Sequence, residues 1–416
     1  MIKFHIPPVD ETAIRAGRNA VNALNFFVAA MQTGFGPFVS VWLVSQGWSL
    51  TEVGVALSVG TVAALCAQVP GGLLVDMVSR KSGITIAALA VAAVSAVMIA
   101  VAPSVPVVWM AQVLHSFASA VITPAIAALT LALCGTDSFS DRLGGNARYA
   151  ALGTALAAAA FGLASERLGE RSIFVITAAL ALPATVSLLA MKPGLHTPDQ
   201  ADHMAFTPRK DRKTKPWTIF RDPRMHIFAV CVILFHLSNA ALLPLALGGI
   251  SQRGDVTGFL VPAAIIIPQL ISAVGSPWAG RMARYLGRRK VLLAGFIALP
   301  ARALLFALNP QPEAVAIIQM LDGVSATVLG IMLPLIASDL TRETGHLNLA
   351  IGCFGLSAGL GATFSTTIAG WVADRMGEEM AFLGLALVGG MATVVLALAM
   401  PETQPKARPR EAAAAA

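Results

Sequence analysis

Twelve long apolar stretches, separated by short polar connections, constrain this sequence more than any other feature. They cover residues 20–45, 51–75, 83–102, 106–134, 147–166, 172–191, 226–249, 257–279, 291–308, 313–338, 347–373 and 380–399. Each is close to the roughly 20 residues that a helix needs to cross the hydrocarbon core of a bilayer. The stretches are continuous rather than alternating, which favours helices over barrel strands. We therefore predict an all-α polytopic membrane protein with twelve transmembrane helices.

The distribution of charge gives the predicted orientation. Only 12% of the 416 residues are charged, whereas a soluble domain carries roughly 25%. Basic residues gather in the connections after spans 2 and 8 and in the stretch 192–224, which all lie on one side of the membrane. Because cytoplasmic loops are enriched in Lys and Arg, this side and both termini are predicted to face the cytoplasm. The predicted location is the cell inner membrane, and bases spread over short loops do not favour a nucleic-acid partner.

The sequence contains no motif for catalysis, a cofactor or a metal. It has no phosphate loop, nucleotide fingerprint or hydrolytic triad. Its four cysteines lie within spans or at their ends and have neither metal-ligand nor disulfide spacing. We therefore predict a protein that is not an enzyme and needs no cofactor or metal.

An internal repeat divides the chain into two halves. With an offset of 208 residues, GLLVDMVSRK from Gly72 aligns with GRMARYLGRRK from Gly280, and residues 153–170 align with 361–378. Two parallel six-helix bundles, related by an axis along the membrane normal, are predicted. The predicted boundaries are a first bundle over 1–191, a basic cytoplasmic linker over 192–225, a second bundle over 226–400 and a disordered tail over 401–416.

The sequence resembles the major facilitator superfamily over essentially its whole length. The family's signature after helix 2 is a Gly, an Asp four residues later and then a basic pair, and the second copy here has Arg284 in place of the acid. The resemblance implies a monomer with a latch in which Asp76 and Arg80 link the halves when the cytoplasmic side is closed. A simple positive-inside anchor is the alternative. The candidate latch residues are Gly72, Asp76, Arg80, Lys81, Gly280, Arg284, Arg288 and Arg289.

Polar side chains are unevenly distributed among the spans. Spans 1, 4, 7 and 10 contain amides, histidines and one acid, whereas the interiors of spans 3, 6 and 12 contain no Asn, Gln, His or charged residue. Since polar groups in hydrocarbon are costly, the polar spans are predicted to line a central path, which resembles the family's cavity. Interhelical packing is the alternative role of the amides. The candidate substrate-binding residues are Gln32, Asn25, Gln112, His236, Asn239 and Gln319.

Two titratable residues occupy equivalent places in the two halves. His115 in span 4 aligns with Asp322 in span 10, and Asp322 is the only carboxylate deep inside a span. A group that titrates there can take up a proton on one side and release it on the other, so both residues are predicted to couple protons to transport. Arg302, in the middle of span 9, either reaches the membrane surface or pairs with a polar group of the cavity.

The leading functional hypothesis is a secondary transporter that works by alternating access. It predicts export of a small amphipathic or cationic compound against protons, because a cation and a proton could compete for Asp322. Uptake of a small metabolite, by symport or facilitated diffusion, is the alternative. Departures from the family's drug–proton antiporters weaken the assignment of antiport, since span 4 has Gln112 where they carry an arginine and span 5 has no proline. A membrane sensor or assembly partner without transport is the hypothesis of another class.

Overall fold

The computed structural model describes residues 11–35, 37–48, 50–136, 138–191, 215–252, 260–308 and 311–404, and every regular element in these ranges is a helix. The helices of the first half are α1 (Glu11–Thr33), α2 (Pro37–Ser45), α3 (Leu50–Met77), α4 (Lys81–Val101), α5 (Val105–Cys134), α6 (Phe139–Leu168), α7 (Arg171–Ala179) and α8 (Ala181–Leu189). Those of the second half are the 3-10 helix η1 (Pro216–Arg221), α10 (Pro223–Asn239), α11 (Leu242–Gln252), α12 (Leu260–Tyr285), α13 (Arg288–Leu308), α14 (Pro312–Thr341), α15 (Leu347–Met376) and α16 (Glu378–Ala399).

Eleven helical segments in the described ranges are long and apolar enough to cross a membrane, with α7 and α8 counted as one segment and α10 with most of α11 as another. The predicted first span, 20–45, is not one of them. It is divided between α1, which begins in polar sequence and ends at Thr33, and α2, which restarts at Pro37. Proline lacks an N–H and readily begins a helix. The twelve-helix count and the cytoplasmic termini stay predictions.

The first helix of each half is interrupted at a related place. The break between α1 and α2 lies next to Pro37, and the break between α10 and α11 lies shortly before Pro244, its equivalent in the repeat. At the second break the N–H of Ala241 donates to Ser365 Oγ of α15 at 3.1 Å. This bond takes the place of the hydrogen bond that a continuous helix would form within itself. Interrupted helices in corresponding positions of two repeats mark binding sites in many transporters.

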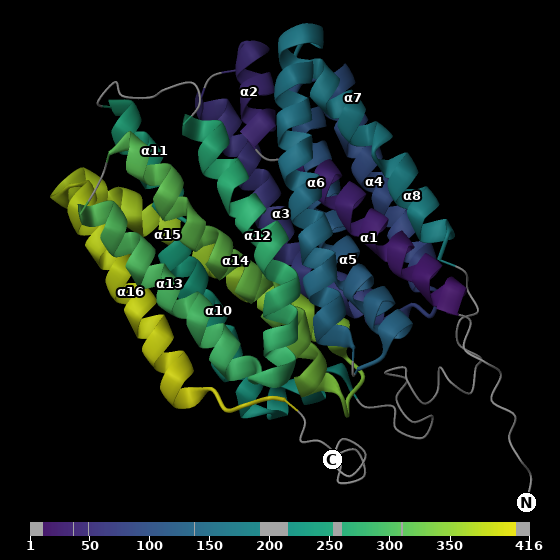
Figure 1. The fold of residues 1–416 in the computed structure, drawn as a ribbon. Helices are drawn as coiled ribbons and strands as arrows, with labels where there is room; N and C mark the ends of the chain where they lie inside the picture. The colour runs from purple at the N-terminus through teal and green to yellow at the C-terminus, as the bar shows by residue number, and fades with distance from the viewer. Residues whose placement is uncertain are drawn as a thin grey trace, which may run out of the picture.

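Two helix pairs join the halves. In Figure 1, the first half (α1–α8) lies beside the second (α10–α16), and α6 approaches α12 toward the lower end of the view. α3 packs along α15 and α6 along α12. One buried apolar cluster at this interface combines Leu131, Phe139 and Leu143 of the first half with Phe228 and Leu340 of the second. The halves therefore share a hydrophobic core at the end that carries the connection between α3 and α4.

Glycines let the two halves approach to backbone contact at this end. A Cβ atom on Gly72 of α3 would overlap the backbone of Asn348 at the start of α15, and one on Gly280 of α12 would meet the carbonyl oxygen of Ser140 in α6. Farther along α15, a Cβ on Gly370 would meet no atom within 4 Å. The structure is thus closed at the predicted cytoplasmic side.

Exposed apolar side chains cover the outer helices. Val97 and Val101 of α4, Leu182 of α8, and Leu387 and Leu398 of α16 are 46–82% exposed. These helices correspond to predicted spans 3, 6 and 12. Since such surface is unfavourable in water, these faces are suited to contact with lipid chains.

Candidate functional site

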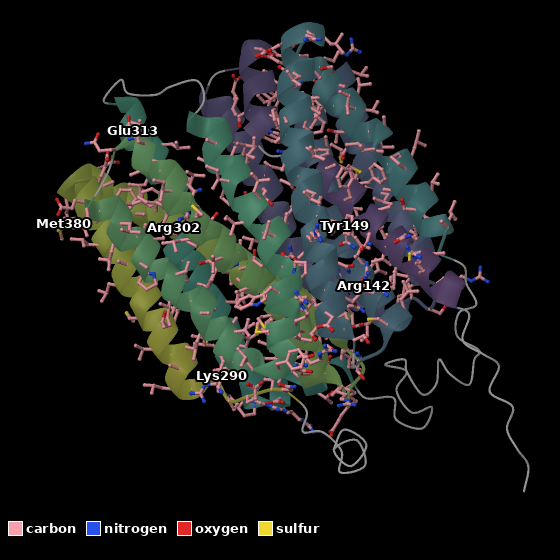
Figure 2. The ribbon with its side chains drawn as sticks, viewed as in Figure 1. Arg142, Tyr149, Lys290, Arg302, Glu313 and Met380 are labelled. Carbon is pink, nitrogen blue, oxygen red and sulfur yellow. The ribbon has the colours of Figure 1, made fainter. Side chains whose placement is uncertain are left out.

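A buried arginine contacts polar side chains from two other helices of the second half. Arg302, in the middle of α13, is only 1% exposed. Its Nη1 donates to Asp322 Oδ1 of α14 at 2.6 Å and to Asn239 Oδ1 of α10 at 2.6 Å. Its Nη2 donates to Gln319 Oε1 of α14. We call Arg302, Asp322, Asn239 and Gln319 the Arg302 cluster. Figure 2 labels Arg302 among the helices of the second half. The residue thus pairs with a polar group rather than reaching the membrane surface.

The members of the Arg302 cluster differ in exposure. Gln319 is fully buried, and its Nε2 donates to the carbonyl oxygen of Ala264 in α12 at 3.0 Å. The amide of this predicted substrate contact is therefore used to orient the guanidinium. The side chain of Asp322 is 21% exposed, whereas that of Arg302 is 2% exposed. The carboxylate is consequently the charged part of the cluster that other molecules can reach.

Charge balance within the Arg302 cluster depends on Asp322. An arginine keeps its proton in proteins, and the two amides are neutral. A buried charge that loses its partner is strongly unfavourable, with a cost of about 3–5 kcal/mol. The cluster is therefore neutral while Asp322 is ionised, and it carries one uncompensated positive charge when Asp322 takes up a proton.

His115 lies in a separate environment in the first half. Its ring stacks on Phe35, in the turn that follows α1, with ring centroids 3.5 Å apart and planes 10° apart. Its Nε2 lies 3.3 Å from Ser119 Oγ, and its Nδ1 is buried without a hydrogen-bond partner. Within the described ranges no hydrogen bond joins His115 to Asp322. The repeat makes the two residues equivalent, but they sit in opposite halves and have different neighbours.

The other predicted substrate contacts do not form one cluster with Asn239 and Gln319. Asn25 donates through Nδ2 to the carbonyl oxygen of Val21 in its own helix at 2.8 Å. Gln112 is 5% exposed, and Gln32 and His236 are half-buried. Contact of these side chains with a substrate stays a prediction.

Asp76 links the two halves at the closed end. Its Oδ1 accepts hydrogen bonds from the backbone N–H and Nδ2 of Asn348, at 3.1 and 2.6 Å, and its Oδ2 accepts from the N–H of Leu349 at 2.8 Å. The first N–H groups of a helix lack partners within it and favour a negative charge. Asp76 of α3 therefore caps α15. Lys81 donates to the carbonyl oxygens at the end of α3, and Arg80 is exposed, so a linking role for Arg80 stays a prediction.

The second copy of the signature forms a contact of opposite polarity. Arg284 of α12 lies with Nη1 3.0 Å from Asp141 Oδ2, in the first turn of α6. In the repeat Arg284 is equivalent to Asp76, and Asp141 is equivalent to Leu349. The first interface has its acid on α3, at Asp76. The second interface has a base at the equivalent place on α12, at Arg284, and its acid lies on α6, the equivalent of α15. Both interfaces between the halves consequently carry an electrostatic contact.

A C-terminal strap, residues 400–404, holds the second copy in place. Glu402 accepts hydrogen bonds from the backbone N–H groups of Arg288 and Arg289, at 2.9 and 3.2 Å, and so caps α13. Gln404 Nε2 donates to the carbonyl oxygen of Arg284 at 2.9 Å. The first four residues of the predicted tail therefore pack against the bundle, and residues 405–416 lie outside the described ranges.

Arg288 is committed to the interior of the second half. Its Nε lies 3.0 Å from Asp339 Oδ2, with both side chains 8% exposed, and its Nη1 donates to the carbonyl oxygen of Ala283 at 2.9 Å. Arg289 donates to the carbonyl oxygen of Ala397 in α16. These two bases of the predicted latch fix α12, α13, α14 and α16 to one another rather than to the first half.

The family model of the Major Facilitator Superfamily matches residues 21–259 and again residues 228–416. The chain belongs to the major facilitator superfamily. This confirms the resemblance seen in the sequence. It identifies a multi-pass membrane protein and a secondary transporter, and points away from an enzyme.

Individual relatives of this superfamily member span nearly all of it. An uncharacterized MFS-type transporter of Mycobacterium tuberculosis is 31% identical over 389 residues, which are 92% of this chain and 93% of the relative. Maltose permease of Geobacillus stearothermophilus is 25% identical over 388 residues, which are 92% of this chain and 95% of the permease.

Two solved structures have the same fold. The human organic anion transporter MFSD10 aligns with a TM-score of 0.70 over 94% of this chain and all of the transporter, at 15% identity. The Escherichia coli fucose–proton symporter aligns with a TM-score of 0.72 over 91% of this chain and 97% of the symporter, also at 15% identity. At this identity the likeness extends to the fold alone.

The contact between Arg284 and Asp141 gives this superfamily member a testable second closure point. The side chains are 40% and 31% exposed, so the pair is worth about 0.2–1 kcal/mol. Arg284→Asp should reduce the free energy that favours the closed state by that amount or more, because two acids then face each other. The closed population should fall accordingly. The charge-swapped variant with Asp141→Arg as well should recover closure. Distances between spin labels at the ends of α3 and α14 measure closure.

Arg281→Asp is the matched control for this experiment, because Arg281 is exposed one turn earlier on α12. It changes the same charge on the same helix and should leave the label distances unchanged. An equal effect of Arg281→Asp would show that general surface charge, and not the pair with Asp141, sets the closed population.

Proposed function

We propose that this transporter couples substrate movement to protons through the Asp322–Arg302 pair. The observation that supports the proposal is the 2.6 Å contact between a buried guanidinium and a carboxylate that is partly exposed. Protonation of Asp322 removes one charge of the pair and leaves the other, so the proton changes the interactions within the bundle core. A buried ionisable residue inside a membrane protein has a functional role by default.

Alternating access would connect this pair to the closed end of the molecule. In the structure Asp76 caps α15 and Arg284 contacts Asp141, so release to the cytoplasm requires both contacts to separate. Each is made of a few hydrogen bonds or one exposed ion pair, which together supply a few kcal/mol. Contacts of this size suit a switch between two states of similar free energy. His115 is proposed as a further group that titrates on the opposite wall.

The pair with Arg302 bears on the direction of transport. Export of a cation in exchange for protons requires the cation to replace the proton on Asp322, but Arg302 already occupies the position of a counter-ion there. We therefore favour the second hypothesis from the sequence, in which the proton and the substrate move in the same direction. A pH gradient of one unit supplies about 1.4 kcal/mol for each proton, which is sufficient for about tenfold accumulation of the substrate.

Proteoliposomes that contain a pH indicator test the proposal. Asp322→Asn should abolish substrate accumulation driven by an inward proton gradient and should abolish the accompanying proton movement. Downhill exchange of substrate without a gradient should persist. Asp374→Asn, which neutralises an exposed carboxylate at the far end of α15, is the control and should behave as the wild type. Full gradient-driven accumulation by Asp322→Asn would overturn the proposal.

A further inference from the structure

We infer that the Arg302 cluster binds a small monocarboxylate, which enters after the proton and takes the place of Asp322 on the guanidinium. The inference rests on the proposed function, because it uses the protonated state of Asp322. It assigns a chemical class to the substrate, and it follows from the charge, the exposure and the unused hydrogen-bond donors of the cluster.

Charge balance selects an anion. With Asp322 protonated, Arg302 keeps its charge and the amides of Asn239 and Gln319 cannot neutralise it. A cation bound at this point would add a second positive charge to a buried site, and a neutral molecule would leave the first uncompensated. A monoanion restores the neutrality that the site has with ionised Asp322. Burial of an unpaired charge costs several kcal/mol, so this difference is sufficient to decide between the three classes.

The other charged side chains of α14 and of α16, which packs on α13, lie near helix ends in the described ranges: Glu313 in the first turn of α14, Asp339 in its last turn and paired with Arg288, and Glu378 and Glu379 in the first turn of α16. Within the described ranges, α12 has no charged side chain from 260 to 280, α15 has none from 347 to 373, and α10 contributes only His236 near Asn239. α6, which also packs on α14, carries Asp141, Arg142 and Arg148 in its first turns. Asp141 contacts Arg284. Asp322 is therefore the carboxylate that balances the charge of Arg302 within the described part of the chain.

The guanidinium is prepared to bind a carboxylate. Asn239 and Gln319 hold Nη1 and Nη2 from two helices, and the ring of Phe306 lies 5.7 Å from the guanidinium carbon. The Nε–H is buried and has no acceptor. Asp322 uses only one of its oxygens. Arginine can donate two parallel hydrogen bonds to a carboxylate, and the Nε–H, on the Nη2 edge of the guanidinium, is a donor that Asp322, bound at Nη1, leaves unused.

Exposure predicts the order of binding. Arg302 is covered while Asp322 is paired with it, since their side chains are 2% and 21% exposed. The proton reaches the exposed carboxylate first and weakens the pair, and the substrate then reaches the guanidinium. Proton and anion binding are therefore cooperative, and their net charge is zero.

Thermal unfolding of the purified full-length protein tests the inference with defined probes. The probes are sodium acetate and sodium benzoate, with benzamide, benzyltrimethylammonium chloride and sodium chloride as matched comparisons. In the wild type the apparent affinity for the carboxylates should rise about tenfold per unit fall in pH where Asp322 is ionised. Asp322→Asn mimics the protonated residue, so its affinity for carboxylates should not change with pH over the same range.

The double variant Asp322→Asn with Arg302→Gln is the matched control, because it removes both charges and leaves the amides. It should lose carboxylate binding. The inference would be overturned if Asp322→Asn bound carboxylates no better than the double variant. It would also be overturned if benzamide, the ammonium compound or chloride stabilised Asp322→Asn as much as the carboxylates do. If Asp322→Asn does not fold, the wild type and Arg302→Gln at low pH provide the same comparison, and only the wild type should bind.

The outcomes separate this inference from the proposed function. Carboxylate binding by Asp322→Asn that still varies with pH would support the anion site and contradict Asp322 as the proton carrier. Loss of gradient-driven proton movement in Asp322→Asn, without any carboxylate binding, would support the proton carrier and contradict the anion site.

Discussion

Asp322→Asn is expected to destabilise the protein by about 3–5 kcal/mol, the cost of leaving a buried charge without its partner. Arg302 cannot lose its proton, so the variant retains a charge that only two amides contact. Arg302→Gln should cost less, because Asp322 can take up a proton and become neutral. The free energy of unfolding in detergent, with no carboxylate present, measures both effects.

The double variant completes a thermodynamic cycle. With both charges removed, no unpaired charge remains, and the stability should return to within about 1–2 kcal/mol of the wild type. The difference between the single and double variants then gives the coupling between the residues. A cost below about 1 kcal/mol for Asp322→Asn would mean that the pair does not form in the protein in detergent.

Gly72→Val should open the closed end of the transporter. A Cβ atom on Gly72 would lie 2.8 Å from the carbonyl carbon of Asn348 and 3.2 Å from Leu349 Cα, and backbone atoms cannot move aside as a flexible side chain can. Overpacking costs about 1–3 kcal/mol, which corresponds to a change of roughly 5- to 150-fold in an equilibrium. The closed population should fall by such a factor.

Distances between spin labels at Met77, which is 75% exposed at the end of α3, and at exposed Glu343 measure the population. Gly370→Ala is the control, because a Cβ atom there meets nothing within 4 Å. It should leave the distances unchanged. An unaltered distance distribution in Gly72→Val would contradict the proposal that backbone contact at this glycine holds the halves together.

Much of the architecture could be predicted because it follows from patterns along the sequence. Apolar runs of membrane length predict helices, and the repeat at an offset of 208 residues predicts two related halves. The break between α1 and α2 was beyond such patterns, since the mean hydropathy of 20–45 does not report where a backbone turns. The sequence gives no more than the glycines and Pro37 as signals of that break.

The partners of the polar residues could not be predicted, because they depend on how helices approach in space. Arg302 lies on α13, and nothing in the periodicity of that span selects Asp322 over a lipid headgroup. Gln319 was a candidate substrate contact, and its burial depends on the carbonyl oxygen of Ala264 in a neighbouring helix. A lone arginine and a lone acid in adjacent spans are the signal that could have suggested the pair.

The reversed polarity of the second interface shows the same limit. The repeat shows that Arg284 replaces an acid. From the sequence alone, this replacement suggests that the second half has lost the contact that Asp76 makes in the first. The compensating residue, Asp141, lies in the other half, at the position that Leu349 occupies in the repeat. Only the approach of α6 to α12 brings the two together.

The contacts of Glu402 and Gln404 determine where this polypeptide can be extended for experiments. A fluorescent protein or affinity tag joined directly to the end of α16 would replace the C-terminal strap. The N–H groups at the start of α13 would then lose Glu402 as their acceptor, and the carbonyl oxygen of Arg284 would lose its hydrogen bond from Gln404. Fusions should therefore begin after Gln404, so that the attached domain leaves the conformational equilibrium of the carrier as it is.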